Sequence, residues 1–267
     1  MLITTEEGGS FSFQCISAGQ FAGKTGWSCP RRSLDSCELI YMLQGEAAIQ
    51  EGLTLFPLEK GDVLVLAPGT THFGLGASGR PVSFFWMDFM LDNLSALGLM
   101  TSCKVHAGND ALAELFRQLQ RFQGDKDYPR QAADLCGLTI LIETAAQQRR
   151  SAVRCRKVLQ DATEWVQQNI CSPITVIQVG KALGYNSDYL TALFKEGFGI
   201  GLKEYIIEQR LKRTEEYLLT TSLPIKKIAA VMGFHDSNSF IKYFTYHRKM
   251  SPSKFRSRYY SSSPGQE

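Results

Sequence analysis

Mostly polar side chains occupy corresponding faces of two segments near the end of the chain, and the chemistry of all but one, Ala192, is hydrogen bonding. The first set is Ser187, Asp188, Thr191, Ala192 and Lys195, and the second set is Ser237, Asn238, Ser239 and Lys242. Hydroxyl, amide and ammonium groups of this kind bond to base edges and to phosphate oxygens. We therefore expect the two sets to contact double-stranded DNA.

A second group of side chains, in the first half of the chain, has the chemistry of a ligand pocket. It consists of Trp27, Arg31, Glu38, His72 and Trp86. Aromatic rings stack on a small polar molecule, and a few charged groups fix its orientation. The alternative is that Trp86 belongs to the core and that Arg31 is solvated. The first interpretation predicts a small-molecule effector.

Few residues in the first half of the chain are of a type that could act in catalysis. The first half contains only His72 and His106, and it contains no His-x-His pair of the kind that a metal-binding barrel uses. Glu38 with His72 is the only acid/base pair available to an enzyme. We expect no catalytic residue, no metal and no cofactor, and we keep a metal-dependent enzyme as the alternative.

Charge and cysteine content point to a reduced, cytoplasmic, DNA-binding chain. Residues 1–150 carry 12 Lys and Arg against 16 Asp and Glu, whereas residues 151–267 carry 17 against 10. A basic second half is what a phosphate-binding module needs. The seven cysteines are spread widely without a close pair, so neither a disulfide framework nor a zinc site is indicated. No apolar run is long enough to cross a membrane.

The elements that must position these groups differ between the two halves. Short β-rich runs are expected at residues 37–43, 47–50, 53–58, 63–66 and 82–89, separated by Gly and Pro turns. Helices are expected at residues 111–122 and 129–150, the second with a stripe of Leu135, Leu138, Ile142 and Ala145. The polar segment 147–156 is the predicted boundary between two domains, and a new helix should follow it. The two helices before the boundary form a dimer interface or a brace between the domains, or their apolar stripe packs on the barrel; the sequence does not separate these alternatives.

Residues 174–195 and 223–244 repeat one another. Gly184-Tyr185 aligns with Gly233-Phe234, and the second copy has one extra residue in its turn. Each copy is predicted to be a helix, a left-handed glycine, an N-cap at Asn186 or Asp236, and a second helix. A connecting helix over residues 202–219 spans roughly 27 Å, close to the ~34 Å between successive major-groove faces.

This repeat resembles the DNA-binding domain of the AraC/XylS family of transcription regulators. The resemblance covers residues 154–259 and includes Ile228 to Phe234, Arg210-Leu211, Phe194-Lys195 and Ser251 to Arg256. It implies two helix-turn-helix units that enter neighbouring segments of the major groove. Three positions depart from the family pattern: Gly180 replaces alanine, Ala192 replaces a frequent arginine, and Thr245 follows Phe244 in place of lysine. The glycine predicts a softer first copy.

Residues 34–73 resemble, more loosely, the cupin barrel that often precedes this domain. The fold class that follows is α+β with two domains: an N-terminal cupin-like antiparallel β-barrel with following helices, and a C-terminal all-α double helix-turn-helix. The expected domains are an effector-binding barrel at 1–100, a helical dimerisation or brace segment at 101–152, and a DNA-binding domain at 153–262.

The sequence therefore predicts a DNA-binding transcription regulator that responds to a small molecule. Family analogy makes a carbohydrate the expected effector, and a homodimer that contacts RNA polymerase the expected assembly. Two alternatives remain at this point: a cupin-type metal enzyme with an appended helical domain, and a regulator that responds to a protein partner.

Overall fold

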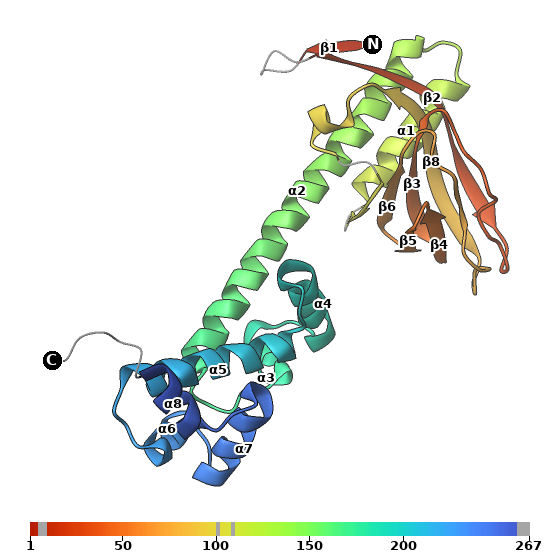
Figure 1. Cartoon of the computed structure of the whole chain (residues 1–267). Helices are drawn as coiled ribbons and strands as arrows, with labels where there is room; N and C mark the ends of the chain where they lie inside the picture. Colours follow the sequence, from red (N-terminus) through yellow and green to blue (C-terminus); the bar gives the residue numbers. More distant parts are fainter. Residues whose placement is uncertain (5–9, 100–101, 108–109, 261–267) are drawn as a thin grey trace. The chain divides into compact units, whose positions relative to one another are not determined.

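The computed structural model describes residues 1–4, 10–99, 102–107 and 110–260. The chain forms two compact units, one ending at Val153 and the other beginning at Arg154. The first unit contains the strands, and the second is entirely helical in its described part (Figure 1). The ends of the predicted domains at residues 100, 101 and 261–262 lie outside the described residues.

The first unit is built from two antiparallel sheets. Its strands are β1 (Leu2–Thr4), β2 (Ser10–Gly23), β3 (Cys37–Gln44), β4 (Glu46–Glu51), β5 (Thr54–Glu59), β6 (Asp62–Leu66), β7 (His72–Gly74), β8 (Val82–Leu91) and β9 (Cys103–His106). The larger sheet has the order β1-β2-β8-β3-β6-β9, and the smaller has the order β5-β4-β7. Neither order closes on itself among the described strands, so the closed barrel expected from the sequence is not confirmed.

Strand β3 lies in the middle of three layers, and its sequence explains why. All six residues from Cys37 to Met42 are buried, as expected of a strand with both faces covered. Leu39 and Tyr41 pack in one core with the helices, whereas Ile40 and Met42 pack in a second core with the smaller sheet. The larger sheet is therefore sandwiched between helices and the smaller sheet.

Helices α1 (Ala111–Gly124) and α2 (Arg130–Asn169) cover the outer face of the larger sheet (Figure 1). The ring of Phe116 stacks on the ring of Phe85 in β8, with centroids 5.1 Å apart. Gly137 allows α2 to lie close to the sheet, because a Cβ there would be 3.1 Å from the Met87 sulfur. The first predicted helix is thus confirmed over residues 111–122.

Two predictions about α2 differ from the structure. One helix of 40 residues runs through segment 147–156, where the sequence predicts that one helix ends before another begins. The segment contains neither Gly nor Pro, so no residue in it stops a helix. The division between the two compact units, at Val153 and Arg154, does lie in this segment. The predicted apolar stripe also faces partly outwards: Leu135 is 54% exposed and Ile142 is 47% exposed. The buried face instead carries Ala133, Cys136, Ile140, Leu141 and Ala145.

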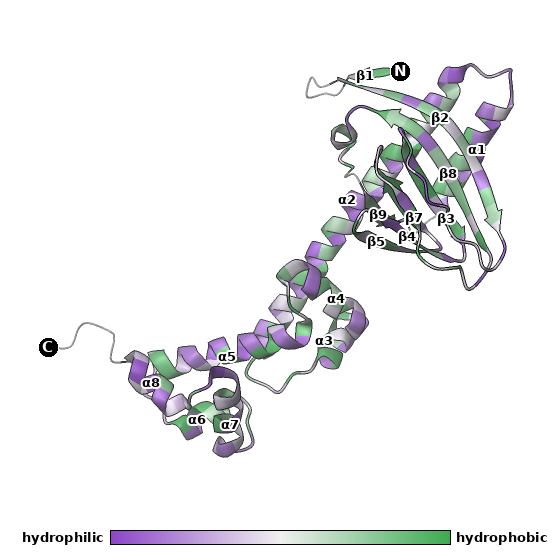
Figure 2. Cartoon of the chain, turned by 45° about the vertical axis from the view of Figure 1, so that its right-hand side comes forward, coloured by the Kyte–Doolittle hydropathy of each residue, from purple (hydrophilic) through white to green (hydrophobic). Residues whose placement is uncertain are grey.

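The second unit repeats one motif on either side of a central helix. Its elements after α2 are α3 (Val176–Leu183), α4 (Ser187–Phe198), α5 (Leu202–Thr220), α6 (Ile225–Val231), α7 (Ser237–Arg248) and α8 (Pro252–Tyr260). Helices α3 and α4 pack with the end of α2, while α6, α7 and α8 pack in a separate core with the later part of α5. Hydrophilic and hydrophobic residues alternate in bands along α5 (Figure 2), as its contacts with both cores require.

The predicted caps are confirmed in both copies. Gly184 and Gly233 have φ of 73° and 74°. The side chain of Asn186 accepts a hydrogen bond from the Asp188 amide at 2.6 Å. The side chain of Asp236 accepts one from the Ser239 amide at 2.8 Å. Each pair is therefore a helix, a tight turn and a second, capped helix.

Close packing explains why residue 180 is a glycine, and the sequence alone did not reveal this reason. A Cβ at this position would lie 2.6 Å from the backbone oxygen of Tyr185, which is closer than side chains approach. The turn of the first copy is one residue shorter, so it passes nearer to its first helix. Packing therefore requires glycine at this position, and alanine would not stabilise the first helix pair.

Candidate DNA interface and effector cavity

The polar residues of α4 and α7 lie where the sequence places them, at the surface. Asp188, Ala192 and Lys195 are exposed on α4, and Asn238, Ser239 and Lys242 are exposed on α7. The opposite faces are buried, by Leu190 and Phe194 in α4 and by Phe240 and Phe244 in α7. Each second helix thus presents a polar ridge to solvent while its apolar face holds it to the unit.

Three of the predicted contact residues have local hydrogen bonds as well. Ser187 and Thr191 are half-buried, and the Thr191 hydroxyl donates to the Ser187 carbonyl at 2.8 Å. The Ser239 hydroxyl donates to the Asp236 carboxylate at 2.6 Å as part of the N-cap. These hydroxyls retain their acceptor lone pairs for a partner. Asn238 and Lys242 are the most open polar groups on the second ridge.

The ridge of α7 continues to residues that the sequence reasoning missed. Tyr246 is 71% exposed, and the ammonium of Lys249 lies 5.1 Å from the centre of its ring. Lys249 ends the helix in the left-handed region with φ of 58°, where the first copy has Gly199. The helical period is the signal that finds Tyr246, because it follows Asn238 by eight residues and Lys242 by four. The exposed ridge is therefore longer and more basic than predicted.

Arg248 fastens the end of α7 to the connecting helix. Its guanidinium bonds to both carboxylate oxygens of Glu208, at 2.9 and 3.1 Å, and it also pairs with Glu215. These bonds raise the pKa of Arg248 and lower the pKa of Glu208. Two-point pairing of this kind fixes direction as well as distance. The ridge is held on a rigid support.

In the first unit, a cavity of about 250 Å³ lies under the larger sheet's inner face. Its lining contains Phe21, Trp27, Cys29, Pro30, Arg32, Glu38, Ile40, Phe84, Trp86 and Asp88. Three of the five predicted effector residues, Trp27, Glu38 and Trp86, are among them. The cavity combines aromatic walls with a few convergent charged groups, as small-molecule sites do.

Arg32 stands at this cavity in place of the predicted Arg31. Arg31 is exposed, and its guanidinium lies 3.9 Å from the centre of the Phe73 ring, outside the lining. Arg32 pairs with Glu38, and its Nε donates to the Nε2 of His72 at 3.0 Å. His72 is 1% exposed and stands behind Glu38 rather than in the lining. Its Nε2 also lies 3.3 Å from Oε2 of Glu38, so His72 contacts both Arg32 and Glu38.

Alternation along the strands explains the residues that were missed. Phe84, Trp86 and Asp88 are spaced by two in β8, so they point to one face. Their partners in β3 are Met42, Ile40 and Glu38, and Glu38 lies directly opposite Asp88. Once Trp86 is assigned to a pocket, strand period alone adds Phe84 and Asp88. Phe21 had no such signal, because β2 was not predicted.

Two glycines of β2 leave room for the indole rings of Trp27 and Trp86. A Cβ on Gly19 would be 2.8 Å from the indole of Trp86, and a Cβ on Gly23 would be 3.0 Å from the indole of Trp27. Both rings therefore lie against bare backbone. The rings of Phe21, Trp27 and Phe84 also pack together, with centroids 5.1 to 5.4 Å apart. The aromatic wall is thus fixed in place before any ligand arrives.

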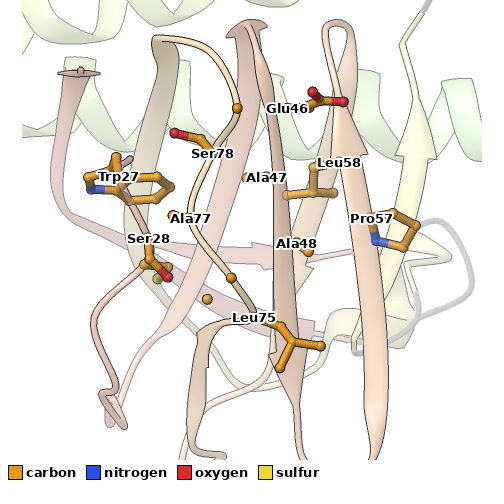
Figure 3. A pocket seen from close by; sticks show the side chains of 14 residues that line it. Trp27, Ser28, Glu46, Ala47, Ala48, Pro57, Leu58, Leu75, Ala77 and Ser78 are labelled. Carbon is orange, nitrogen blue, oxygen red and sulfur yellow. The ribbon is translucent and has the colours of Figure 1, made fainter. Parts of the chain in front are cut away.

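A second hollow, of about 290 Å³, shares Trp27 and Cys29 with the first cavity (Figure 3). Small residues of β4 and of segment 74–79 line it, together with Glu46, Pro57 and Leu58. Its only charged lining residue is the exposed Glu46. Because buried polar groups do not converge on it, we take the first cavity as the better effector site.

The cysteines and the possible metal ligands are a further set of titratable groups. In the described part of the chain no three His, Cys, Asp or Glu side chains come together as a metal would require. None of the seven cysteines forms a disulfide. Burial raises the pKa of Cys15 to about 12, and of Cys37 and Cys136 to about 11, so these thiols stay protonated at neutral pH. No helix among the described residues is long and apolar enough to span a bilayer.

Comparisons with known proteins match both units. A family profile described as an AraC-like ligand binding domain matches residues 14–135, and one described as a helix-turn-helix domain matches residues 179–258. The chain is 25% identical to the HTH-type transcriptional regulator YisR of Bacillus subtilis, over 90% of this chain and 92% of that protein. It is 25% identical to the Msm operon regulatory protein of Streptococcus mutans, over 83% and 84% of the two chains.

The helical unit alone matches a shorter regulator. The chain is 31% identical to the regulatory protein SoxS of Escherichia coli K12, over 39% of this chain and 96% of SoxS. The match to a complete small regulator agrees with a second unit that has its own cores and its own paired helices. The chain therefore belongs to the AraC family: it is a DNA-binding transcription regulator with an N-terminal ligand-binding domain and a C-terminal helix-turn-helix domain.

Proposed function

We propose that the chain reads a specific operator with the ridges of α4 and α7, each in one segment of the major groove. The contacts on α4 are Ser187, Asp188, Thr191, Ala192 and Lys195, and those on α7 are Ser237, Asn238, Ser239 and Lys242. The observation that carries this proposal is the exposed polar ridge that recurs in both capped helix pairs. The connecting helix α5 has 19 residues, or about 28 Å of helix, which suits two ridges one turn of DNA apart.

Asn238→Ala tests the readout. An amide that bonds to a base edge contributes about 1 to 3 kcal/mol of discrimination, so operator affinity should fall roughly 5- to 150-fold. Binding to random DNA should stay the same, because that binding rests on phosphates. The operator comes from selection of genomic fragments, and affinities are measured by fluorescence anisotropy at one fixed salt concentration.

Lys195→Ala is the matched comparison. This exposed lysine follows the buried face of α4, and we assign it to a phosphate. Its loss should weaken operator and random DNA alike and make the salt dependence shallower. An equal loss on both DNAs for Asn238→Ala would remove Asn238 from the readout.

For the first unit, we propose a small polar metabolite as effector, bound in the cavity under Trp27 and Trp86. A carbohydrate is the expectation from family analogy. The support is the fixed aromatic wall with charged groups at its edge. We retain the cupin-like barrel as the description of domain 1–100, with the two open sheets as its halves.

Hydrogen bonds through β2 connect the cavity lining with helix α2. Asp88 in the lining accepts a hydrogen bond from Ser17, at 3.3 Å, beside an irregularity in β2 between Cys15 and Ser17. The Cys15 amide there donates to Asp134 of α2, at 2.8 Å. A ligand that engages Asp88 therefore acts one step from the helix that continues into residues 154–169. The ligand shifts DNA binding only if it favours one arrangement over another.

We propose a homodimer as the working form. Leu135, Ile142 and Val153 are exposed apolar residues on one face of α2, spaced by 7 and 11 residues. A second copy of this face would cover them. In this dimer, residues 101–152 are the dimerisation segment and residues 153–262 are the DNA-binding domain. RNA polymerase is the proposed partner at the promoter. The protein acts in the cytoplasm and is not an enzyme.

A further inference from the structure

The carboxylates of Glu38 and Asp88 both belong to the lining of the effector cavity. Oδ1 of Asp88 is buried and accepts no hydrogen bond, while its other oxygen accepts from Ser17. One oxygen of Glu38 pairs with Arg32. The other, Oε2, is buried without a hydrogen bond, although Nε2 of His72 lies 3.3 Å from it. A buried acceptor without a donor is destabilising, so Oδ1 of Asp88 above all is a place where a ligand can donate.

The two carboxylates also oppose each other. Glu38 and Asp88 are direct partners across the antiparallel strands β3 and β8, where like charges destabilise a sheet. Burial raises the pKa of Asp88, and the charge of Glu38 raises it further. Against these two carboxylates the lining has one guanidinium, that of Arg32, and the imidazole of His72 lies behind Glu38, 3.3 Å from its Oε2. In the lining itself, acidic groups therefore outnumber basic ones.

The aromatic wall has the complementary property. The faces of aromatic rings attract cations, and tryptophan does so most strongly. Trp27 and Trp86 both line the cavity, with Phe21 and Phe84 beside them. Anionic ligands are excluded by the carboxylates, and a neutral polyol would leave the excess charge uncompensated. A cation with several N–H donors satisfies the charge, the open acceptors and the rings together.

We propose that the effector is a small organic cation, an amine or amidine, whose N–H groups donate to Glu38 and Asp88 while its body lies on the tryptophans. This rests on the proposed effector site and narrows its ligand from polar metabolites in general to cationic ones. Arg32 closes one side of the site by holding the second oxygen of Glu38. Because Glu38 is already paired with Arg32, Asp88 is the main ion-pair partner of the ligand.

Calorimetric titration of the full chain with two ligands of equal shape tests the charge. Benzamidine is a planar cation, and benzamide is its neutral counterpart. Benzamidine should bind at least about tenfold more tightly, the factor that 1.4 kcal/mol of ion-pair and cation–π attraction gives. Asp88→Asn should remove most of this preference. Glu46→Gln is the control, because it removes an equal charge that lies outside this cavity, in the second hollow.

A second measurement needs no ligand. Asp88→Asn removes the like-charge pair, so the melting temperature of the ligand-free protein at neutral pH should rise by about 2 to 4 °C. The gain should shrink as the pH falls through the pKa of Asp88, because the wild-type carboxyl then becomes neutral as well. Glu46→Gln should not shift the melting temperature in this way.

Several results would overturn the proposal. They are equal affinity for benzamide, no binding of benzamidine, a preference unaffected by Asp88→Asn, or a lower melting temperature for Asp88→Asn. Tighter binding of D-glucose than of benzamidine would also reject the cation while keeping the effector cavity. Operator binding by the same protein, measured in parallel, shows separately whether the DNA-reading function stands.

Discussion

Arg210→Ala should lower the free energy of unfolding of the helical unit by about 3 to 5 kcal/mol, the largest effect we expect from a polar substitution. Arg210 is 7% exposed in the middle of α5. Its guanidinium donates to the carbonyls of Ile170 and Ser172 after α2, and to that of Met232 at the end of α6, at 2.6 Å. Alanine would leave three carbonyls short of a donor and a cavity in their midst.

The measurement is urea unfolding followed by far-ultraviolet circular dichroism, which reports mainly on helices. Arg213→Ala is the control on the same helix: this arginine is exposed and pairs only with Glu216 at the surface, so its loss should change stability by at most about 0.5 kcal/mol. Arg210→Lys should fall between the two, because an ammonium lacks the planar fork. If Arg210→Ala matched Arg213→Ala, the three-carbonyl contact would not hold the unit together.

Gly233→Ala should destabilise the same junction by about 3 kcal/mol or more, while Gly184→Ala should cost only about 1 to 2 kcal/mol. Both glycines are left-handed, so both substitutions carry the conformational penalty. At Gly233 a Cβ would also lie 2.6 Å from the Cys171 oxygen and 3.1 Å from the Pro173 ring. At Gly184 nothing lies within 4 Å. The difference between the two variants therefore isolates the close approach.

The same urea titration compares the two variants, and each serves as the other's control. Gly233→Ala should also weaken operator binding when α7 shifts, whereas Gly184→Ala should leave the α7 contacts unchanged. Equal losses of stability would mean that the loop at Cys171 to Pro173 is free to move away. That result would weaken the account of how the second helix pair is held.

The sequence predicted best where one local signal decides the structure. The glycine turns and the caps at Asn186 and Asp236 were found because each requires a particular residue type at a fixed position. The strands 37–43 and 63–66 were found because turn residues flank them. The polar segment 147–156 is predicted to end one helix and does contain the division between the two units, but α2 continues through it because it holds neither Gly nor Pro.

The effector cavity was predicted only in part, because it depends on pairing between distant strands. Trp27, Glu38 and Trp86 were chosen for their chemistry. The strand period adds Asp88 once Trp86 is assigned, but its position opposite Glu38 follows only from the pairing of β3 with β8. Arg31 and Arg32 are adjacent, and sequence alone does not say which one turns inwards. The buried Oδ1 of Asp88 without a hydrogen-bond donor is a property of packing, which no periodicity reveals.

The central claim is that both recognition helices of one chain read successive turns of one duplex. Missing-base interference on the selected operator tests it directly. Each half-site should show two clusters of essential bases about 10 base pairs apart, and Asn238→Ala should abolish only one of them. A single cluster in each half-site, or the loss of both clusters with Asn238→Ala, would contradict the claim.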